Sequence, residues 1–131
     1  MAKEKYRREV ESVLAKYLFG ASEVRRFPKK VEFAVSDSPL EGSEFDYDLD
    51  GYPVPKYTED PSYVIEVIEK CREKGVFLEV SAHVGKYEVR ALDVNGHEFR
   101  DSISVRSSLP FAVAESASAA LKELKVLGKL I

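Results

Sequence analysis

The first apolar pattern in the chain is a stripe at helical spacing near the N-terminus. Its members follow one another at intervals of three and four residues, with Glu, Lys and Arg between them. This spacing predicts an amphipathic helix from Lys3 to Phe19, which Gly20 ends. The stripe consists of Val10, Val13, Leu14, Tyr17 and Leu18.

The segment after this helix alternates only loosely between apolar and polar residues. Pro28 interrupts it, and proline cannot donate a hydrogen bond to a sheet. We therefore expect a bent or edge strand from Val24 to Val35, regular only from Lys30 onward. Residues 36–57 are rich in Gly, Pro, Ser and Asp, which predicts a long surface loop of the kind that often has a function.

A second helix is predicted after this loop. Asp60 is a suitable N-cap, and Pro61 fits the first helical position because it lacks only a donor that would stay unpaired there. Gly75 is expected to end the helix. The predicted inner face comprises Val64, Ile65, Ile68 and Cys71.

Three antiparallel strands and a final helix are predicted for the rest of the chain. Alternating apolar and polar residues indicate the strands, and Asn95–Gly96 is a strong hairpin signal because both residues tolerate positive φ. The final helix is expected from Pro110 to Leu124, with small alanines that let it lie close to the sheet. The expected strands cover residues 77–84, 86–94 and 98–106, and the buried stripe of the helix comprises Val113, Ala117, Ala120, Leu121 and Leu124.

Together these elements predict one α+β domain over residues 1–131. Its antiparallel sheet has three or four strands in a helix–three strands–helix unit, with an N-terminal helix before it and helices on both faces. A chain of 131 residues can bury a core without disulfides or metal. Cys71 is the only cysteine, as in proteins of reducing compartments, and no apolar run could span a membrane. We therefore expect a cytoplasmic protein.

Charge is unevenly distributed along the chain. The net charge is −3, but residues 1–30 hold nine basic and four acidic side chains, whereas residues 41–60 hold one basic and seven acidic ones. A polarised molecule of this kind could self-associate head to tail or attract a charged partner, but a solvated surface is the favoured interpretation. The scarcity of Asn, Gln, Cys and Met beside abundant Lys and Glu is typical of thermophile proteins. Drift in a short chain and a redesigned sequence are the alternatives.

One acidic segment resembles half of a calcium-binding loop. Asp46, Asp48 and Asp50 precede Gly51 in the order D-x-D-x-D-G, which matches the first six positions of such a loop. The twelfth position should be a bidentate Glu, and here it is Tyr57. A solvated acidic loop is the alternative to a metal site, and no cofactor is expected.

Catalytic motifs are absent from the sequence. It contains no G-x-S-x-G elbow, P-loop or G-x-G-x-x-G, and neither His83 nor His97 has metal-ligand neighbours at a suitable spacing. A small hydrolase is the competing class of function. It would require a pocket that holds one of these histidines beside a carboxylate.

Three arginines are predicted to share the outward face of the sheet. Alternation along the third strand places Ile103 and Val105 inward, and Ser102 and Ser104 outward. If the same face is open, it forms a cationic surface suited to an anionic ligand such as a nucleotide. The alternative is an ordinary solvated sheet with Arg–Glu pairs across its strands. The candidate anion-binding residues are Arg90, Arg100, Arg106 and His83.

The order of elements from Asp60 to Leu124 is similar to that of the double-stranded-RNA-binding domain. That family uses lysines at the start of its last helix to hold phosphates across the groove. Here the segment is Ser107-Ser-Leu-Pro-Phe-Ala112, which contains no lysine. An RNA-binding module is therefore a further alternative, and nucleic acid is not the favoured partner.

Three stretches of the chain resemble the phage ABA sandwich domain family, whose members are small proteins of phages and prophages. Leu14-Ala-Lys-Tyr-Leu-Phe-Gly20 resembles the end of the family's first helix, without its usual Trp, and Val54-Pro-Lys-Tyr-Thr-Glu-Asp60 resembles the entry to its second. Ser107 to Leu124 resembles its closing helix. The resemblance implies an α-β-α sandwich and a phage or prophage origin, and it carries over no functional residue.

The predicted function is therefore binding without catalysis. We expect a phage- or prophage-encoded protein that acts in the host cytoplasm as an anti-defence or regulatory factor. Its partner would be a host protein or a small anionic nucleotide, and it is expected to form a homo-oligomer that does not associate with membranes.

Overall fold

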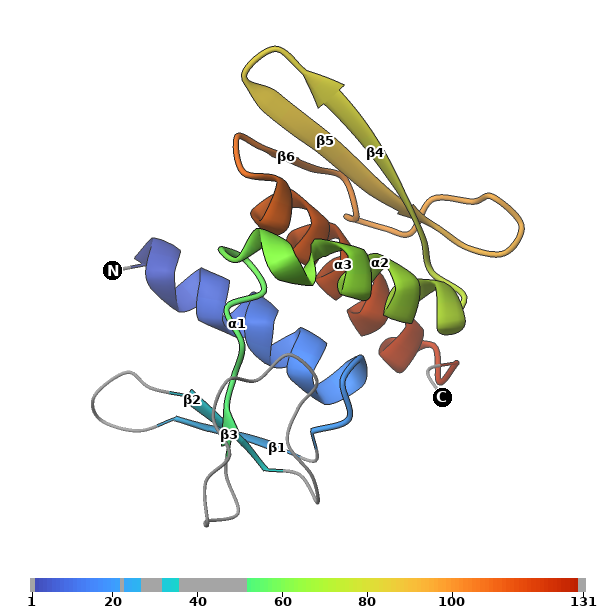
Figure 1. Cartoon of the computed structure of the whole chain (residues 1–131). Helices are drawn as coiled ribbons and strands as arrows, with labels where there is room; N and C mark the ends of the chain where they lie inside the picture. The colour runs from blue at the N-terminus through green and yellow to red at the C-terminus, as the bar shows by residue number, and fades with distance from the viewer. Residues whose placement is uncertain (1, 22, 27–31, 36–51, 130–131) are drawn as a thin grey trace.

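The computed structural model describes residues 2–21, 23–26, 32–35 and 52–129, with their side chains within 5–21 and 54–129 (Figure 1). Three helices and two small antiparallel sheets make up this part of the chain. In order the elements are α1 (Ala2–Tyr17), β1 (Glu23–Arg26), β2 (Glu32–Val35), β3 (Tyr52–Pro53), the 3₁₀ helix η1 (Pro61–Tyr63), α2 (Val64–Glu73), β4 (Phe77–His83), β5 (Lys86–Leu92), β6 (Ser104–Arg106) and α3 (Leu109–Val126).

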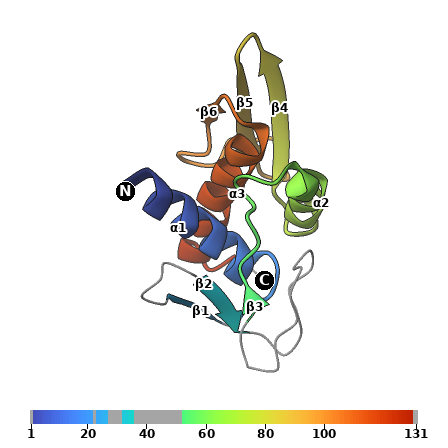
Figure 2. The same ribbon diagram turned by 60° about the vertical axis from the view of Figure 1, so that its left-hand side comes forward.

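The helices lie between the two sheets (Figures 1 and 2). The sheet β1–β2–β3 packs on α1, and the sheet β4–β5–β6 packs on α3 and α2. α3 is the central helix, because it contacts α1, α2 and all three strands of the second sheet. The predicted α+β class, with a helix, three antiparallel strands and a helix after an N-terminal helix, is confirmed.

The outer face of the β4–β6 sheet has no helix on it in the part of the chain that the structure describes. α2 and α3 both lie on the inner face, and α1 contacts α3 and the first sheet instead. Glu79, Arg90 and Val105 on the outer face are exposed. The described residues therefore differ from the expectation of helices on both faces, because α1 uses its apolar stripe against α3.

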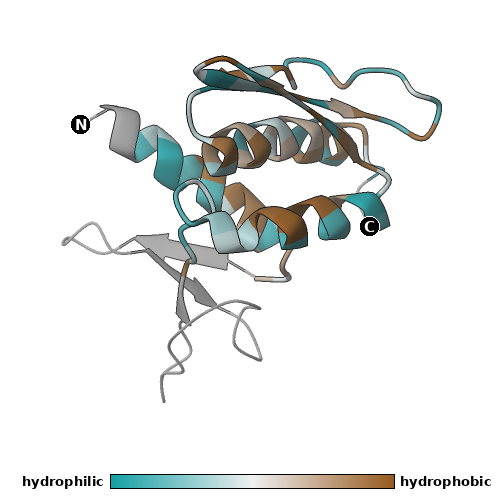
Figure 3. Ribbon diagram, turned by 45° about the horizontal axis from the view of Figure 1, so that its top comes forward, coloured by the Kyte–Doolittle hydropathy of each residue, from teal (hydrophilic) through white to brown (hydrophobic). Residues whose placement is uncertain are grey.

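The core forms around the small residues of α3. Ala112, Ala117 and Ala120 are fully buried, so α1 and the sheet approach this helix closely. Most residues of α3 itself are apolar or weakly polar along the length of the helix (Figure 3). All five residues of its predicted stripe are buried, as are Val10 and Leu14 of the α1 stripe. The helical patterns in the sequence therefore identified most of the core.

The inner face of α2 differs from the prediction at one position. Ile65 is 67% exposed, whereas Val67 is buried and packs in the core. The buried positions Val64, Val67 and Cys71 follow the spacing of three and four residues that a single helix face requires.

The third strand of this sheet is shorter than predicted, and its faces are reversed. Asp101 has a φ of 58°, and this left-handed backbone interrupts the expected strand, so that β6 begins only at Ser104. Ile103 and Val105 are half exposed, whereas Ser102 and Ser104 are buried. The inward prediction for Ile103 and Val105 and the outward prediction for the two serines were therefore wrong.

Hydrogen bonds explain why serines can occupy these buried positions. The hydroxyl of Ser102 accepts a bond from the backbone N of Ala91 at 3.2 Å and donates one to the carbonyl of Ala91 at 3.3 Å. The hydroxyl of Ser104 donates to the carboxylate of Glu115 at 2.5 Å. A buried polar group that is fully hydrogen-bonded avoids most of the desolvation penalty.

Candidate functional site

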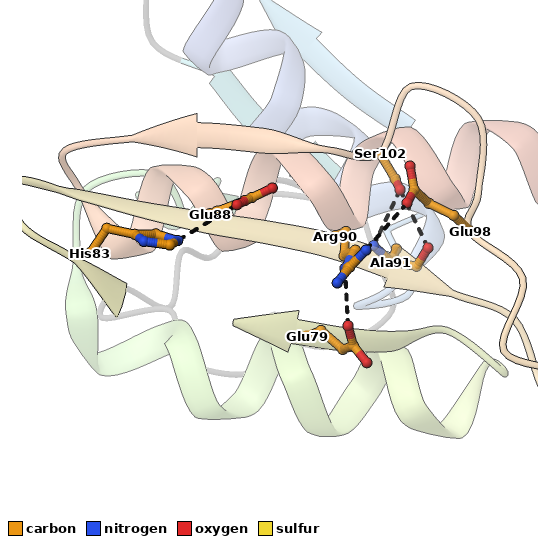
Figure 4. A network of polar contacts seen from close by, with 7 residues as sticks. All are labelled: Glu79, His83, Glu88, Arg90, Ala91, Glu98 and Ser102. Carbon is orange, nitrogen blue, oxygen red and sulfur yellow. Dashed lines mark hydrogen bonds and ion pairs between the residues drawn. The ribbon is translucent and has the colours of Figure 1, made fainter. Parts of the chain in front are cut away.

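Arg90, the first of the four candidate anion-binding residues, lies on the outer face of the sheet between two glutamates (Figure 4). Its Nε is 3.0 Å from Oε1 of Glu79 on the neighbouring strand, and its Nη1 is 3.8 Å from Oε2 of Glu98. The charge of Arg90 is therefore matched locally, as in the alternative of cross-strand Arg–Glu pairs.

His83 lies on the same outer face, at the far end of β4. Its Nε2 is 3.6 Å from Oε2 of Glu88 on β5, and both side chains are exposed (Figure 4). His97 has a similar neighbour, since its Nδ1 is 4.0 Å from Oδ2 of Asp93. Both histidines thus have a carboxylate nearby, and both imidazole side chains are exposed at the surface rather than buried beside it.

Arg106 lies on the opposite face, toward α3, because the strand reversal turns it inward. Its Nε and Nη2 donate to the two carboxylate oxygens of Glu115 at 3.0 and 2.9 Å. This bidentate geometry is the strongest form of an Arg–carboxylate contact. The prediction that Arg90 and Arg106 share one face was therefore wrong.

Glu115 receives two further hydrogen bonds. The hydroxyls of Ser104 on β6 and Tyr6 on α1 each donate to it at 2.5 Å. Partial burial raises the pKa of Glu115, but the bonds from Arg106, Ser104 and Tyr6 outweigh burial and lower it to about 2. Burial and the bond to this carboxylate raise the pKa of the Tyr6 hydroxyl to about 12. The cluster therefore joins α1, β6 and α3 through one carboxylate that is ionised at neutral pH.

The aromatic ring of Phe111 also contacts this cluster. The guanidinium carbon of Arg106 is 4.4 Å from the centroid of its ring, and that of Arg7 is 4.6 Å from it. Cations over a buried aromatic ring are attracted to its face, which restricts their positions. Arg106 is thus held both by the carboxylate of Glu115 and by the ring of Phe111.

A groove of about 890 Å³ begins at this cluster and continues between α3 and the segment that leads into β6. Its α3 wall is one helix face, with members three and four residues apart. Its other wall includes Ile103 and Val105, both half exposed. The α3 wall consists of Glu115, Ser118, Ala119, Lys122, Glu123 and Val126. We call this hollow the β6–α3 groove.

Arg100 lies at the other end of the β6–α3 groove. Its backbone N donates to Oε2 of Glu123 at 2.8 Å, which fixes the loop to α3. The structure shows no ion pair for the side chains of Arg100 and Lys122 within the described ranges. Two of the four candidates, Arg100 and Arg106, thus share the groove, whereas Arg90 and His83 lie on the outer face of the sheet.

Sequence reasoning missed Tyr6, Glu115 and Lys122 as residues of this groove. Tyr6 and Glu115 are 109 positions apart, and no local pattern relates them. Glu115 did carry a signal, because it is a lone acidic residue in an Ala-rich stretch of the final helix.

The predicted metal ligands Asp46, Asp48 and Asp50 lie outside the described residues. Within the described ranges, no group of three His, Cys, Asp or Glu side chains could hold a metal ion. Burial raises the pKa of the Cys71 thiol to about 12, so its thiolate is scarcely populated at neutral pH. No described helix combines the length and apolar character that crossing a membrane requires.

Comparison with known proteins gives no match to a family model, to a curated protein or to a solved structure. The resemblance to the phage ABA sandwich domain family therefore stays a prediction from the sequence.

Proposed function

We propose that this protein is a non-catalytic binding module that takes an extended segment of a partner protein into the β6–α3 groove. The observation that carries this proposal is the free edge of β6 beside the groove. β6 pairs with β5 on one side, and no described strand pairs with its other side. An edge strand offers unpaired backbone N–H and C=O groups, which an extended peptide can use as an additional strand.

The walls of the groove suit such a segment. Ile103, Val105, Val126 and Leu127 are half exposed or more, and they would gain burial against apolar side chains of the partner. The small residues Ser118 and Ala119 leave room for a backbone between them and the edge of β6. Peptide addition to a strand beside a helix obtains affinity from the backbone and specificity from such side-chain contacts.

The cluster around Glu115 keeps one end of the groove in a fixed shape. Four hydrogen bonds from Tyr6, Ser104 and Arg106 hold the carboxylate between three elements. A groove that is already ordered loses less entropy when a ligand binds.

The charge distribution favours a protein segment over a small anionic nucleotide. The guanidinium groups of Arg90 and Arg106 are both engaged by glutamates. The groove also holds Asp101 and Glu123 beside Arg100 and Lys122, so its formal charges balance. A nucleotide would have to displace these partners or use the two remaining cations alone.

The biological setting in this proposal comes from the sequence resemblance. A phage- or prophage-encoded module of this kind would bind a host protein in the cytoplasm, as an anti-defence or regulatory factor does. The groove is where we place that contact.

The proposal can be tested with a displayed library of linear peptides selected on the immobilised full chain. Peptides that bind should lose at least about tenfold in affinity to Ala119→Trp, a loss of about 1.4 kcal/mol, because the indole fills the groove beside β6. Val84→Trp is the matched control, since it adds the same indole at a fully exposed turn residue outside the groove. Selected peptides that bind both variants with equal affinity would contradict the proposal. So would a selection that yields no peptide, together with ATP or GTP binding that Ala119→Trp abolishes.

A further inference from the structure

The opposite edge of the same sheet is formed by β4, which at seven residues is longer than the three-residue β6. β4 runs for seven residues in continuous register with β5, and no described strand pairs with its other side. Natural edge strands are usually protected by lysine, proline, a bulge or short length. β4 contains neither lysine nor proline, and its pairing with β5 shows no bulge.

The helix-facing side of β4 is also incompletely covered. Leu78, Val80 and Ala82 point to the side on which α2 and α3 lie, yet Val80 is 42% exposed and Ala82 is exposed. α2 has only ten residues, about 15 Å at 1.5 Å per residue, whereas the β4–β5 hairpin continues beyond it (Figure 1). The apolar residues near the end of β4 therefore lack a covering element among the described residues.

We propose that the free edge of β4 binds the β4 of a second copy of this chain, so that two sheets join into one across a two-fold axis. Two antiparallel copies of the strand Phe77–His83 overlap along their whole length when Val80 lies on the axis. In this register Leu78 of each copy faces Ala82 of the other, and the two Val80 side chains face one another. All of these side chains are apolar and lie on the helix-facing side.

The same register avoids opposed charges on the outer side. Phe77 faces His83 of the second copy, and Glu79 faces Ser81. Like charges directly opposite across a strand pair are destabilising, and none occur here. Glu79 is already paired with Arg90 at 3.0 Å, which limits its repulsion from the diagonal Glu79 of the other copy. The strand is thus complementary to itself in both apolar pattern and charge, which is what a two-fold contact requires.

This self-association is independent of the peptide groove, because β4 and β6 are the two opposite edges of the sheet. The two surfaces can therefore be inactivated separately. Ala119→Trp should leave the dimer intact, and Val80→Lys should leave peptide binding intact.

Sedimentation velocity of the full chain over a range of concentrations tests the proposal. The wild type is expected to dimerise, and Val80→Lys should raise the dimer dissociation constant by about tenfold or more, because lysine on an edge opposes strand pairing. Val84→Lys is the matched control, since Val84 lies beyond the paired strand and is fully exposed. Circular dichroism spectra and melting curves establish that each variant is folded.

A second variant tests the register without adding a charge. Val80→Cys should form a disulfide between two copies under mild oxidation, whereas Val84→Cys should not, because only residue 80 lies on the axis. The native Cys71 is buried and should not compete. A wild-type chain that stays monomeric at all concentrations, a dimer that Val80→Lys leaves unchanged, or cross-linking of Val84→Cys alone would overturn the proposal.

Discussion

Arg106 on β6 and Glu115 on α3 form a bidentate ion pair, with nitrogen–oxygen distances of 3.0 and 2.9 Å. The pair joins the edge of the sheet to the central helix at the end of the β6–α3 groove. We expect Arg106→Ala to destabilise the fold by about 1–2 kcal/mol, because hydrogen bonds to a charged group are lost and partial exposure reduces the effect. Urea unfolding measures this change, and an unaltered midpoint would mean that the pair contributes nothing.

The pH dependence of stability should reflect the same carboxylate. Its pKa in the folded protein is about 2, below the ordinary value of 4.5. A lowered pKa means that Glu115 contributes stability above pH 4.5, and this contribution is lost as the pH falls from about 5 toward 2. The difference in unfolding free energy between wild type and Glu115→Gln should therefore shrink over this window. A constant difference from pH 7 to pH 2 would contradict the assignment.

Glu11 is a buried carboxylate whose pKa is shifted in the opposite direction. Burial raises its pKa, while two hydrogen bonds from Thr58 lower it in part. These bonds run from the backbone N of Thr58 at 3.2 Å and from its hydroxyl at 2.8 Å, and they tie α1 to the segment before α2. A raised pKa means that the ionised form opposes folding, so the contribution of Glu11 is most favourable at low pH and declines as the pH rises through the folded pKa.

Two substitutions at this position should therefore have different effects on stability at pH 7. Glu11→Gln removes the buried charge and keeps an acceptor for Thr58, so its stability should equal or exceed that of the wild type. Glu11→Ala leaves the Thr58 donors unsatisfied and should destabilise the fold by about 1–3 kcal/mol. Chemical denaturation at pH 7 compares the two, and a Gln variant less stable than the Ala variant would refute this account.

Arg90 should contribute little to either stability or binding. Its side chain and that of Glu79 are each half exposed, and exposed ion pairs of this kind contribute at most about 1 kcal/mol. Arg90→Ala should leave the affinity for selected peptides unchanged in titration calorimetry. If instead it abolished binding of a ligand, the site would lie on the outer face of the sheet.

The amino-acid sequence predicted the helices of this structure better than it predicted the strand β6. The stripe in α1 and the Ala-rich face of α3 are local periodic patterns, and tertiary packing did not override them. A turn does form at Asn95–Gly96, with a positive φ at Gly96 but not at Asn95. Asp93 supports it by accepting bonds from the backbone N of Asn95 and His97 at 2.8 and 3.0 Å.

The faces of β6 could not be predicted from alternation. The left-handed backbone of Asp101 breaks the strand expected from residue 98 to 106. A shift of one position along a strand moves every following side chain to the other face of the sheet. Ser102 and Ser104 can be buried because Ala91 and Glu115, from other elements of the fold, provide their hydrogen-bond partners. The groove depends on these same long-range contacts, so its residues became recognisable only in three dimensions.

Amide hydrogen exchange with and without a selected peptide tests the central claim most directly. The account predicts slower exchange in β6 and in the α3 wall of the β6–α3 groove when the peptide is bound, because the free strand edge acquires hydrogen-bond acceptors. Exchange in β4 should not change, since that edge is not involved. Protection confined to β4 or to the outer face of the sheet, with β6 unchanged, would contradict the account.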